Sequence, residues 1–245
     1  MVASARIEKR KIRERVWKLL EEQGVARFPL PVHGRIPNFE GSERAAELLR
    51  SLEIWKRARA IVVSPDSPQH PVRERAILEG KILYMPTPRL RGDFVELRRE
   101  YVPRGEKRRA TAIRYAFRYG RTVKLGEMSP VDLVVMGSVA VDRDGGRVGK
   151  GGGYSDLEYA ILRELGNREL PVVTTVHPLQ IVDRVPMEPH DVPVDYIVTP
   201  DEIIETHTPH PKPRGIRWEL VSNERSEGMP VLRELNRVLE GLRDP

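Results

Sequence analysis

Short runs of apolar residues, many of them β-branched, alternate with helix-like segments along most of this chain. The runs stand at 60–63 (AIVV), 82–85 (ILYM), 172–176 (VVTTV) and 196–198 (YIV). The segments between them have the length and the apolar spacing of helices, and they cover 71–80, 106–119 and 156–165. Buried strands that alternate with helices are typical of a mostly parallel sheet with helices on both faces. We therefore predict an α/β fold built on such a sheet.

The two ends of the chain differ from this alternating part. Residues 6–23 have apolar side chains at helical spacing and Lys and Arg on the opposite face, which predicts an amphipathic helix. The stretch 206–213 (THTPHPKP) predicts an extended linker that leads to a last helix near 231–242. We predict a single α/β domain over 1–205, with peripheral N- and C-terminal helices, and a C-terminal extension over 206–245 packed on it.

Composition narrows the cellular setting and the kind of partner. Hydrophobic residues make up 39% of the 245 residues, enough for a core, and cysteine is absent, which excludes disulfides and thiolate metal sites. We find neither a secretory leader nor an apolar run of membrane-spanning length, so we expect a soluble, cytoplasmic protein. The formal net charge of +6 favours anionic partners, namely nucleotides, polyanionic small molecules or nucleic acid.

The passage with the clearest chemistry is a glycine-rich loop at Arg147–Asp156, which reads R-V-G-K-G-G-G-Y-S-D. It follows the apolar run 131–141 and precedes a helical segment. Ser155 and Glu158 have the spacing of a capping box, which predicts a helix start at this point. Free N–H groups at a helix start, with Arg147 and Lys150 beside them, form a site suited to phosphate. We predict that the loop binds the phosphates of a nucleotide, most simply ATP.

Known nucleotide motifs do not fit this loop. The P-loop pattern is missing, because Lys150 lies among the glycines and no Ser or Thr follows it directly. The alternative is a flexible surface turn, but two cations and a capped helix within ten residues favour the phosphate site.

Three stretches, in order along the chain, resemble the 5-formyltetrahydrofolate cyclo-ligases, also called 5,10-methenyltetrahydrofolate synthetases. The glycine loop resembles that family's R-x-G-x-G-x-G-Y-Y-D, residues 9–13 (K-R-K-I-R) resemble its K-x-x-L-R, and residues 188–195 (E-P-H-D-V-P-V-D) resemble its late acidic stretch. A still closer resemblance is to the branch called methenyltetrahydrofolate synthetase domain-containing proteins. Near matches to that branch occur at 31–39, 86–91, 137–141 and 212–218.

This resemblance implies an ATP-dependent ligase of one-carbon metabolism that cyclises 5-formyltetrahydrofolate, or a related formyl-pterin, to 5,10-methenyltetrahydrofolate with release of ADP and phosphate. It gives catalytic roles to Lys150 and Arg147, and Mg²⁺-binding roles to Asp156 and Asp191. The residues that it assigns to ATP are Lys9, Arg13, Gly149, Gly151, Gly152, Gly153 and Tyr154. Tyr154 would also line the shared ATP and folate site.

Two departures from the family pattern leave a second interpretation open. The second Tyr of the loop is Ser155, and the stretch 64–73 lacks the family's folate-contacting Glu, for which Asp66 could substitute. The alternative is a nucleotide- or RNA-binding protein of the same fold that has lost the reaction. With 6% aromatic residues and no run of them on the basic helix, we expect RNA binding to be weak and non-specific. Taken alone, Asp156 could complement a helix dipole, and Asp191 could be a turn residue.

Overall fold

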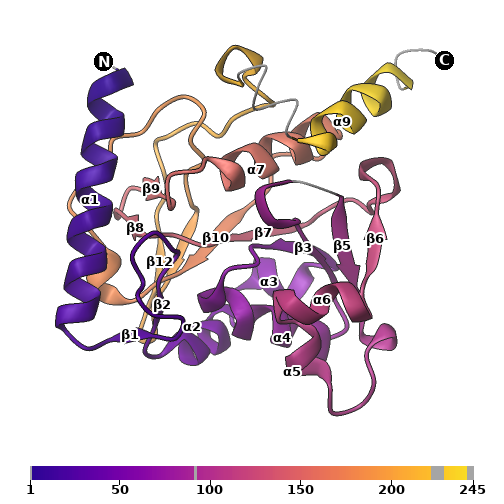
Figure 1. Ribbon diagram of the computed structural model, residues 1–245, viewed down its shortest axis with the longest axis horizontal. Coiled ribbons are helices and arrows are strands. Elements are labelled where there is room, and N and C mark those ends of the chain that lie inside the picture. Colours follow the sequence, from indigo (N-terminus) through magenta and orange to yellow (C-terminus); the bar gives the residue numbers. More distant parts are fainter. Residues whose placement is uncertain (1, 91–92, 222–228, 242–245) are drawn as a thin grey trace.

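An eight-stranded sheet forms the centre of the computed structural model, which describes residues 2–90, 93–221 and 229–241 (Figure 1). The strand order is β12-β11-β10-β7-β3-β4-β5-β6. The parallel strands are β3 (Ala60–Val63), β4 (Ile82–Met85), β7 (Leu133–Met136), β10 (Val172–Thr175) and β11 (Tyr196–Val198). The antiparallel strands at the two edges are β5 (Phe94–Leu97), β6 (Arg121–Val123) and β12 (Ile203–Glu205). The predicted α/β fold with a mostly parallel sheet is confirmed.

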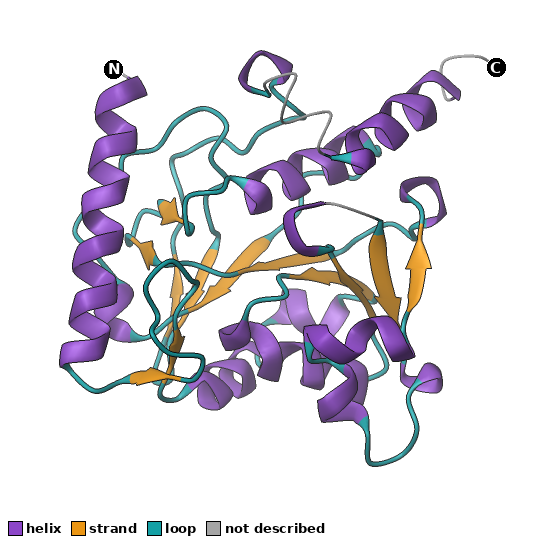
Figure 2. Cartoon of the chain, viewed as in Figure 1, coloured by secondary structure: helices purple, strands orange, loops and turns teal. Residues whose placement is uncertain are grey.

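Helices cover both faces of this sheet (Figures 1 and 2). One face carries α2 (Ser42–Leu49), α3 (Glu53–Arg57), α4 (His70–Leu78), α5 (Lys107–Ala110) and α6 (Ile113–Tyr119). The opposite face carries α7 (Tyr154–Glu164) and α9 (Pro230–Gly241). Single turns of 3-10 helix occur at Ser67–Gln69, Pro88–Leu90, Arg99–Tyr101, Leu125–Glu127, Pro178–Gln180 and Trp218–Leu220.

Strands β3, β4 and β7 are apolar at every position because each of their two faces is covered. In β3, Ala60 and Val62 point to the α7 side, while Ile61 and Val63 point to the α2 and α4 side. Strands buried on both faces lack the polar alternation of a half-exposed sheet. This explains why β3 and β4 have the bounds that their apolar runs predict.

The N-terminal helix α1 (Val2–Glu22) lies beside the sheet rather than on it (Figure 1). It packs through Ile12, Val16 and Leu20 against a small hairpin formed by β8 (Ala140–Val141) and β9 (Arg147–Val148). A second two-stranded ribbon, β1 (Ala26–Arg27) with β2 (Asn38–Phe39), lies in the connection after it. Within the described ranges, none of the helices has both the length and the apolar content that are needed to cross a membrane.

Several predicted elements need correction. The helix predicted over 106–119 is two helices, because Ala112 adopts an extended conformation between them. The apolar run 131–141, which we expect to be interrupted at Gly137 and Ser138, forms β7 and β8, and residues 137–139 separate the two strands. Strands β5, β6 and β12 were not predicted. In β5, the buried Glu96 interrupts the apolar pattern; it accepts hydrogen bonds from the hydroxyls of Tyr84 and Tyr101.

The C-terminal segment contributes to the core on the α7 side. Its buried apolar residues belong to the same cluster as Leu157 and Ile161 of α7; they are Ile216, Met229, Val231, Leu232 and Leu235. In the linker, the Lys212 ammonium donates to the Asp195 carboxylate at 2.6 Å and to the Leu170 carbonyl at 3.0 Å. The division into a domain over 1–205 and an extension over 206–245 stays a prediction.

Candidate functional site

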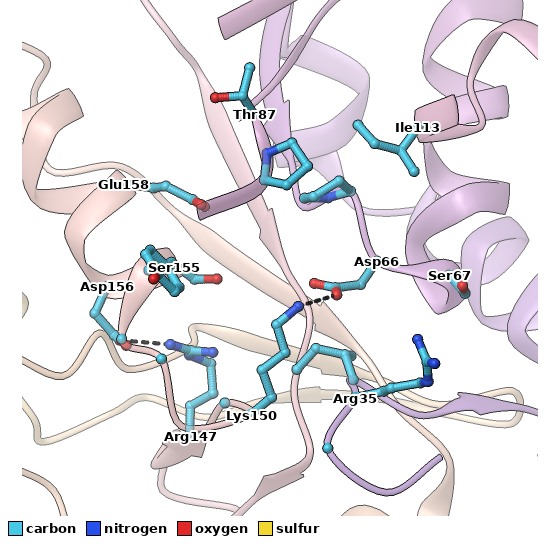
Figure 3. A pocket seen from close by; sticks show the side chains of 18 of the residues that line it. Arg35, Asp66, Ser67, Thr87, Ile113, Arg147, Lys150, Ser155, Asp156 and Glu158 are labelled. Atoms are coloured by element: carbon cyan, nitrogen blue, oxygen red, sulfur yellow. Dashed lines mark hydrogen bonds and ion pairs between the residues drawn. The ribbon is translucent and has the colours of Figure 1, made fainter. Parts of the chain in front are cut away.

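The order of the parallel strands changes direction between β3 and β7. From β3 the chain continues to β4 on one side, and from β7 it continues to β10 and β11 on the other. Ligands of open α/β sheets bind at such a point, outside the carboxyl ends of the strands. A cavity of about 530 Å³ lies there, which we call the switch-point cavity (Figure 3). It is lined by 65–67 after β3, by 87–88 after β4, and by the glycine loop with the start of α7.

The glycine loop takes backbone conformations that only glycine adopts readily. Gly151 has φ 104° and Gly153 has φ 63°. Gly153 is the residue before α7, and no described side chain caps that end of the helix. The predicted capping box of Ser155 and Glu158 is therefore wrong, because α7 already begins at Tyr154. The residues of the first turn, 154–156, line the cavity, and a helix start of this kind is suited to an anion.

Lys150 projects from the loop into the switch-point cavity (Figure 3). Its ammonium donates to the Asp66 carboxylate at 2.8 Å, and 44% of its side chain is exposed. This ion pair joins the glycine loop to the loop after β3. A cation that is half-exposed and held by one carboxylate can change partners at low cost when a phosphate enters.

Arg147, the first residue of the glycine loop, is buried and binds the backbone and the acid that surround it. Its residue is 3% exposed, and its guanidinium donates to the Gly137 carbonyl at 3.0 Å and to the Asp156 carboxylate at 2.6 Å. A longer hydrogen bond reaches the Val192 carbonyl at 3.4 Å. The guanidinium lies at the cavity wall, but its Nε and both terminal nitrogens already have protein acceptors. Its role toward phosphate stays a prediction.

Asp156 and the segment that contains Asp191 are neighbours in the fold. The Asp156 Oδ1 atom accepts from the Val192 amide at 3.0 Å, and Val192 follows Asp191 directly in the chain. Burial and the nearby charge of Asp156 raise the pKa of Asp191. Lys9 reaches the same place from α1 and donates to both Asp191 and Glu188, the latter at 2.8 Å. Lys9 is 7% exposed, so it is not part of the solvated face of α1.

This pair of carboxylates fits a hydrated cation. Asp156 uses Oδ1 for Arg147 and Val192, and among the described residues none donates to its Oδ2. Asp191 uses Oδ2 for Lys9 and the Glu188 amide. The Oδ1 atom of Asp191 lies 3.8 Å from the His190 Nε2 atom, so this oxygen and the Oδ2 atom of Asp156 are the ones that would face Mg²⁺ or its water shell, as this hard ion prefers oxygen ligands. A neighbouring set of Glu188, His190 and Asp191 has candidate ligand atoms within 4.8 Å of one another.

Helix α1 also holds the glycine loop directly. The Nε atom of Arg13 donates to the Gly149 carbonyl at 2.7 Å. Burial lowers the pKa of Arg13, with the charge of Arg6 acting in the same direction. The predicted ATP-binding residues Lys9 and Arg13 therefore both lie at the acidic and glycine-rich stretches that the sequence singled out. Contact with ATP itself stays a prediction.

Sequence reasoning missed the position of Glu158 in the cavity wall. It lines the switch-point cavity and is 8% exposed, whereas we had placed it in a capping box. A signal was present, because residue 158 falls on the same buried helical stripe as Ile161 and Leu162. Acidic side chains are rarely buried without a partner, so an acid on a buried helical stripe is a signal in the sequence. Arg35 and Ile113, which also line the cavity, have no local sequence signal.

Comparisons with known proteins identify the family of this chain. The model of the 5-formyltetrahydrofolate cyclo-ligase family matches residues 5–200. A methenyltetrahydrofolate synthase domain-containing protein of Bos taurus is 45% identical over 241 residues, which is 96% of this chain and 63% of that protein. Its Homo sapiens counterpart is 43% identical over 236 residues, which is 94% of this chain and 61% of that protein. The chain thus spans about three fifths of the length of these curated relatives.

More distant relatives have enzyme names. The 5-formyltetrahydrofolate cyclo-ligase of Escherichia coli strain K12 is 32% identical over 78 residues, which is 32% of this chain and 41% of that protein. The fold is similar to an NMR structure of Aquifex aeolicus 5,10-methenyltetrahydrofolate synthetase, with a TM-score of 0.52 and 22% identity over 83% of this chain and 95% of that one. With a family model that matches most of its length, this chain belongs to the 5-formyltetrahydrofolate cyclo-ligase family.

Proposed function

We propose that this protein catalyses the ATP-dependent cyclisation of 5-formyltetrahydrofolate, or of a related formyl-pterin, to the 5,10-methenyl form, with release of ADP and phosphate. One observation carries the proposal: the switch-point cavity places a glycine loop and the start of helix α7 beside a cation and two carboxyl groups. The glycine loop and the helix start suit phosphates, and the carboxyl groups suit a polar, hydrogen-bonding ring.

The residues of the loop supply positioning and charge rather than an acid–base pair. Phosphoryl transfer to the formyl oxygen needs the two substrates held together and the charge of the phosphates neutralised. Lys150 is the cation that reaches into the cavity, and the amides of Gly151, Gly152 and Gly153 surround the helix start. Arg13 and Arg147 hold that backbone in place. Asp156 and Asp191 would hold the Mg²⁺ that accompanies ATP, and this ion would neutralise phosphate charge.

The direct test is to mix the protein with MgATP and 5-formyltetrahydrofolate and to follow the absorbance of the methenyl product. We expect product and ADP in equal amounts, and no product when ATP is omitted. Tight ATP binding without product would contradict the proposal and favour a nucleotide-binding protein that has lost the reaction. Absence of ATP binding would contradict the phosphate site itself.

Replacing Lys150 by alanine should weaken ATP binding by about 1.5–3 kcal/mol, the size of a hydrogen bond to a charged group. By the usual conversion this is roughly a 10- to 150-fold rise in the dissociation constant. Stability should change by less than about 1 kcal/mol, because the Lys150–Asp66 pair is partly exposed. Isothermal titration calorimetry with ATP measures the first effect, and urea unfolding measures the second.

The matched control is Lys18→Ala on α1. Lys18 is also a lysine in a 3.6 Å ion pair with one glutamate, but its side chain is 74% exposed and lies outside the cavity lining. We expect its ATP affinity to equal that of the unmodified protein. If Lys150→Ala folds normally and binds ATP as tightly as this control, Lys150 does not contact the phosphates.

A further inference from the structure

Arg35 lines the switch-point cavity as a third cation beside Lys150 and Arg147. The other two cations each donate to a carboxylate of the same cavity. Among the residues that the structure describes, no acid forms an ion pair with Arg35, and its guanidinium donates only through Nε, to the Pro31 carbonyl at 3.2 Å. Both terminal nitrogens of this guanidinium are therefore available to a ligand.

The turn that presents Arg35 is fixed to helix α1 and to the core. The Arg35 amide donates to the Val32 carbonyl at 3.0 Å, and the Arg35 carbonyl accepts from the Trp17 indole at 2.9 Å. The side chains of Val32 and Ile36 are buried in the cluster that contains the apolar residues of α1. The Val32 amide also donates to the Glu21 carboxylate at 2.9 Å. Because this backbone is already ordered, a ligand of Arg35 binds with a smaller loss of entropy.

Arg35 lies across the cavity from the start of α7 (Figure 3). In that view, Lys150 lies between Arg35 and Asp156. Apolar side chains line the cavity as well, namely those of Pro29, Ile36, Pro65, Pro88 and Ile113. A ligand that uses the whole cavity therefore meets the glycine loop on one side, apolar walls, and an available guanidinium on the other side.

The chemical complement of such a guanidinium is a carboxylate. Two terminal N–H groups of an arginine are parallel and can donate to both oxygens of one carboxylate. A folate carries carboxylates on the glutamate at the end of its side chain, and the benzoyl ring that precedes this glutamate is flat and apolar. The pterin ring and its formyl group are at the opposite end. The sequence of polar ring, apolar ring and carboxylate thus matches the groups that the cavity offers.

We propose that Arg35 binds a carboxylate of the folate side chain and so selects a folate over a formyl-pterin whose side chain is uncharged; this inference rests on the proposed function. Phosphate at the glycine loop and carboxylate at Arg35 would use different cations, so ATP and the folate bind together without competing for one of them. The contact is remote from the reacting formyl group. Arg35 is therefore a specificity-determining residue and not a catalytic one.

The test compares 5-formyltetrahydrofolate with an analogue that carries aniline in place of the aminobenzoylglutamate. The analogue keeps the pterin ring, the formyl group and N10, so it can still cyclise, but it has no carboxylate. In the unmodified protein, kcat/KM should be at least about tenfold lower for the analogue, the loss expected when a hydrogen-bonded charged contact is removed. The absorbance of the methenyl product measures both reactions.

Arg35→Ala should lower kcat/KM for 5-formyltetrahydrofolate by about the same factor. The loss should come from a higher KM at unchanged kcat, because the contact is the same in the ground state and the transition state. With the analogue, Arg35→Ala and the unmodified protein should be equal. Arg35→Lys keeps the charge but not the bidentate geometry, so its kcat/KM for the folate should lie between the two.

The matched control is Arg15→Ala. Arg15 is an exposed arginine of α1 outside the cavity lining, so its removal should leave both substrates unaffected. ATP affinity, measured by calorimetry, should be equal in Arg35→Ala and the unmodified protein. A loss of ATP affinity in Arg35→Ala would show that this arginine binds phosphate, and it would overturn the inference.

Two kinetic results would overturn the inference while leaving the proposed function intact. One is an equal kcat/KM for the folate and the analogue in the unmodified protein. The other is an equal loss with both substrates in Arg35→Ala, which would mean that Arg35 supports the cavity without contacting the side chain. If the unmodified protein binds ATP but converts neither substrate, the proposed function is wrong, and the inference is wrong with it.

Discussion

Replacing Arg147 by methionine should destabilise the protein by about 3–5 kcal/mol, the cost of breaking a buried ion pair by removing one partner. The guanidinium is buried and joins the Gly137 carbonyl to the Asp156 carboxylate. Burial alone would raise the pKa of Asp156, but the charge of Arg147 and the Val192 amide outweigh it and hold this pKa below its usual value. Without Arg147, the acid would be buried with its main counter-charge removed. Urea unfolding at neutral pH measures the loss.

The double variant Arg147→Met with Asp156→Asn is the control for this interpretation. It removes both charges, so it should recover part of the stability that the single variant loses. Equal losses in the single and double variants would show that the carbonyl contacts of Arg147, rather than its charge pair, support the loop. A loss below about 1 kcal/mol in the single variant would mean that Arg147 is not structural.

Ending the chain after Glu205 should abolish cooperative folding. The cluster on the α7 side would lose five buried apolar side chains, namely those of Ile216, Met229, Val231, Leu232 and Leu235. Each is worth roughly 1.5–3 kcal/mol when buried, so together they match the 5–15 kcal/mol by which a typical domain is stable. Circular dichroism during thermal unfolding would show a broad transition or none. A sharp transition at an unchanged temperature would contradict this.

Two point variants in α9 give the same test without deletion. Leu235 is fully buried, so Leu235→Ala should cost about 2–5 kcal/mol. Arg233 is exposed on the same helix, and Arg233→Ala should change stability by no more than about 0.5 kcal/mol. Similar stabilities for the two variants would show that α9 does not belong to the core. The family match ends at residue 200, so these side chains are a part of the fold that the match does not cover.

The sequence predicted the centre of the fold better than its edges, for a physical reason. Strands β3 and β4 are apolar throughout because both faces are covered, and such runs stand out from their surroundings. Strand β5 contains the buried Glu96, and β6 begins with Arg121, whose guanidinium lies 3.5 Å from that acid. An edge strand that is held partly by charge pairs has no apolar run to reveal it.

The candidate site, like the fold, could be predicted from the sequence only in part. The glycine loop was predictable because its glycines and cations are adjacent in the chain. The partners of its side chains were not, because Lys150 and Asp66 are separated by 84 residues, and Lys9 and Asp191 by 182. Only the strand order brings such residues together. Glu158 was misassigned because a spacing rule was applied to a helix whose first residue had been placed too late.

The ion pair between Lys150 and Asp66 makes the two halves of the cavity thermodynamically dependent on each other. A phosphate that takes Lys150 as its partner leaves the Asp66 carboxylate without its counter-ion, and a ring N–H that binds Asp66 releases Lys150. Whichever ligand arrives second therefore finds its protein group already freed. The coupling free energy is the same in either direction, so MgATP would raise the affinity for the pterin by the factor by which the pterin raises the affinity for MgATP. If the proposed function holds, this single contact of 2.8 Å would favour the ternary complex over either binary one.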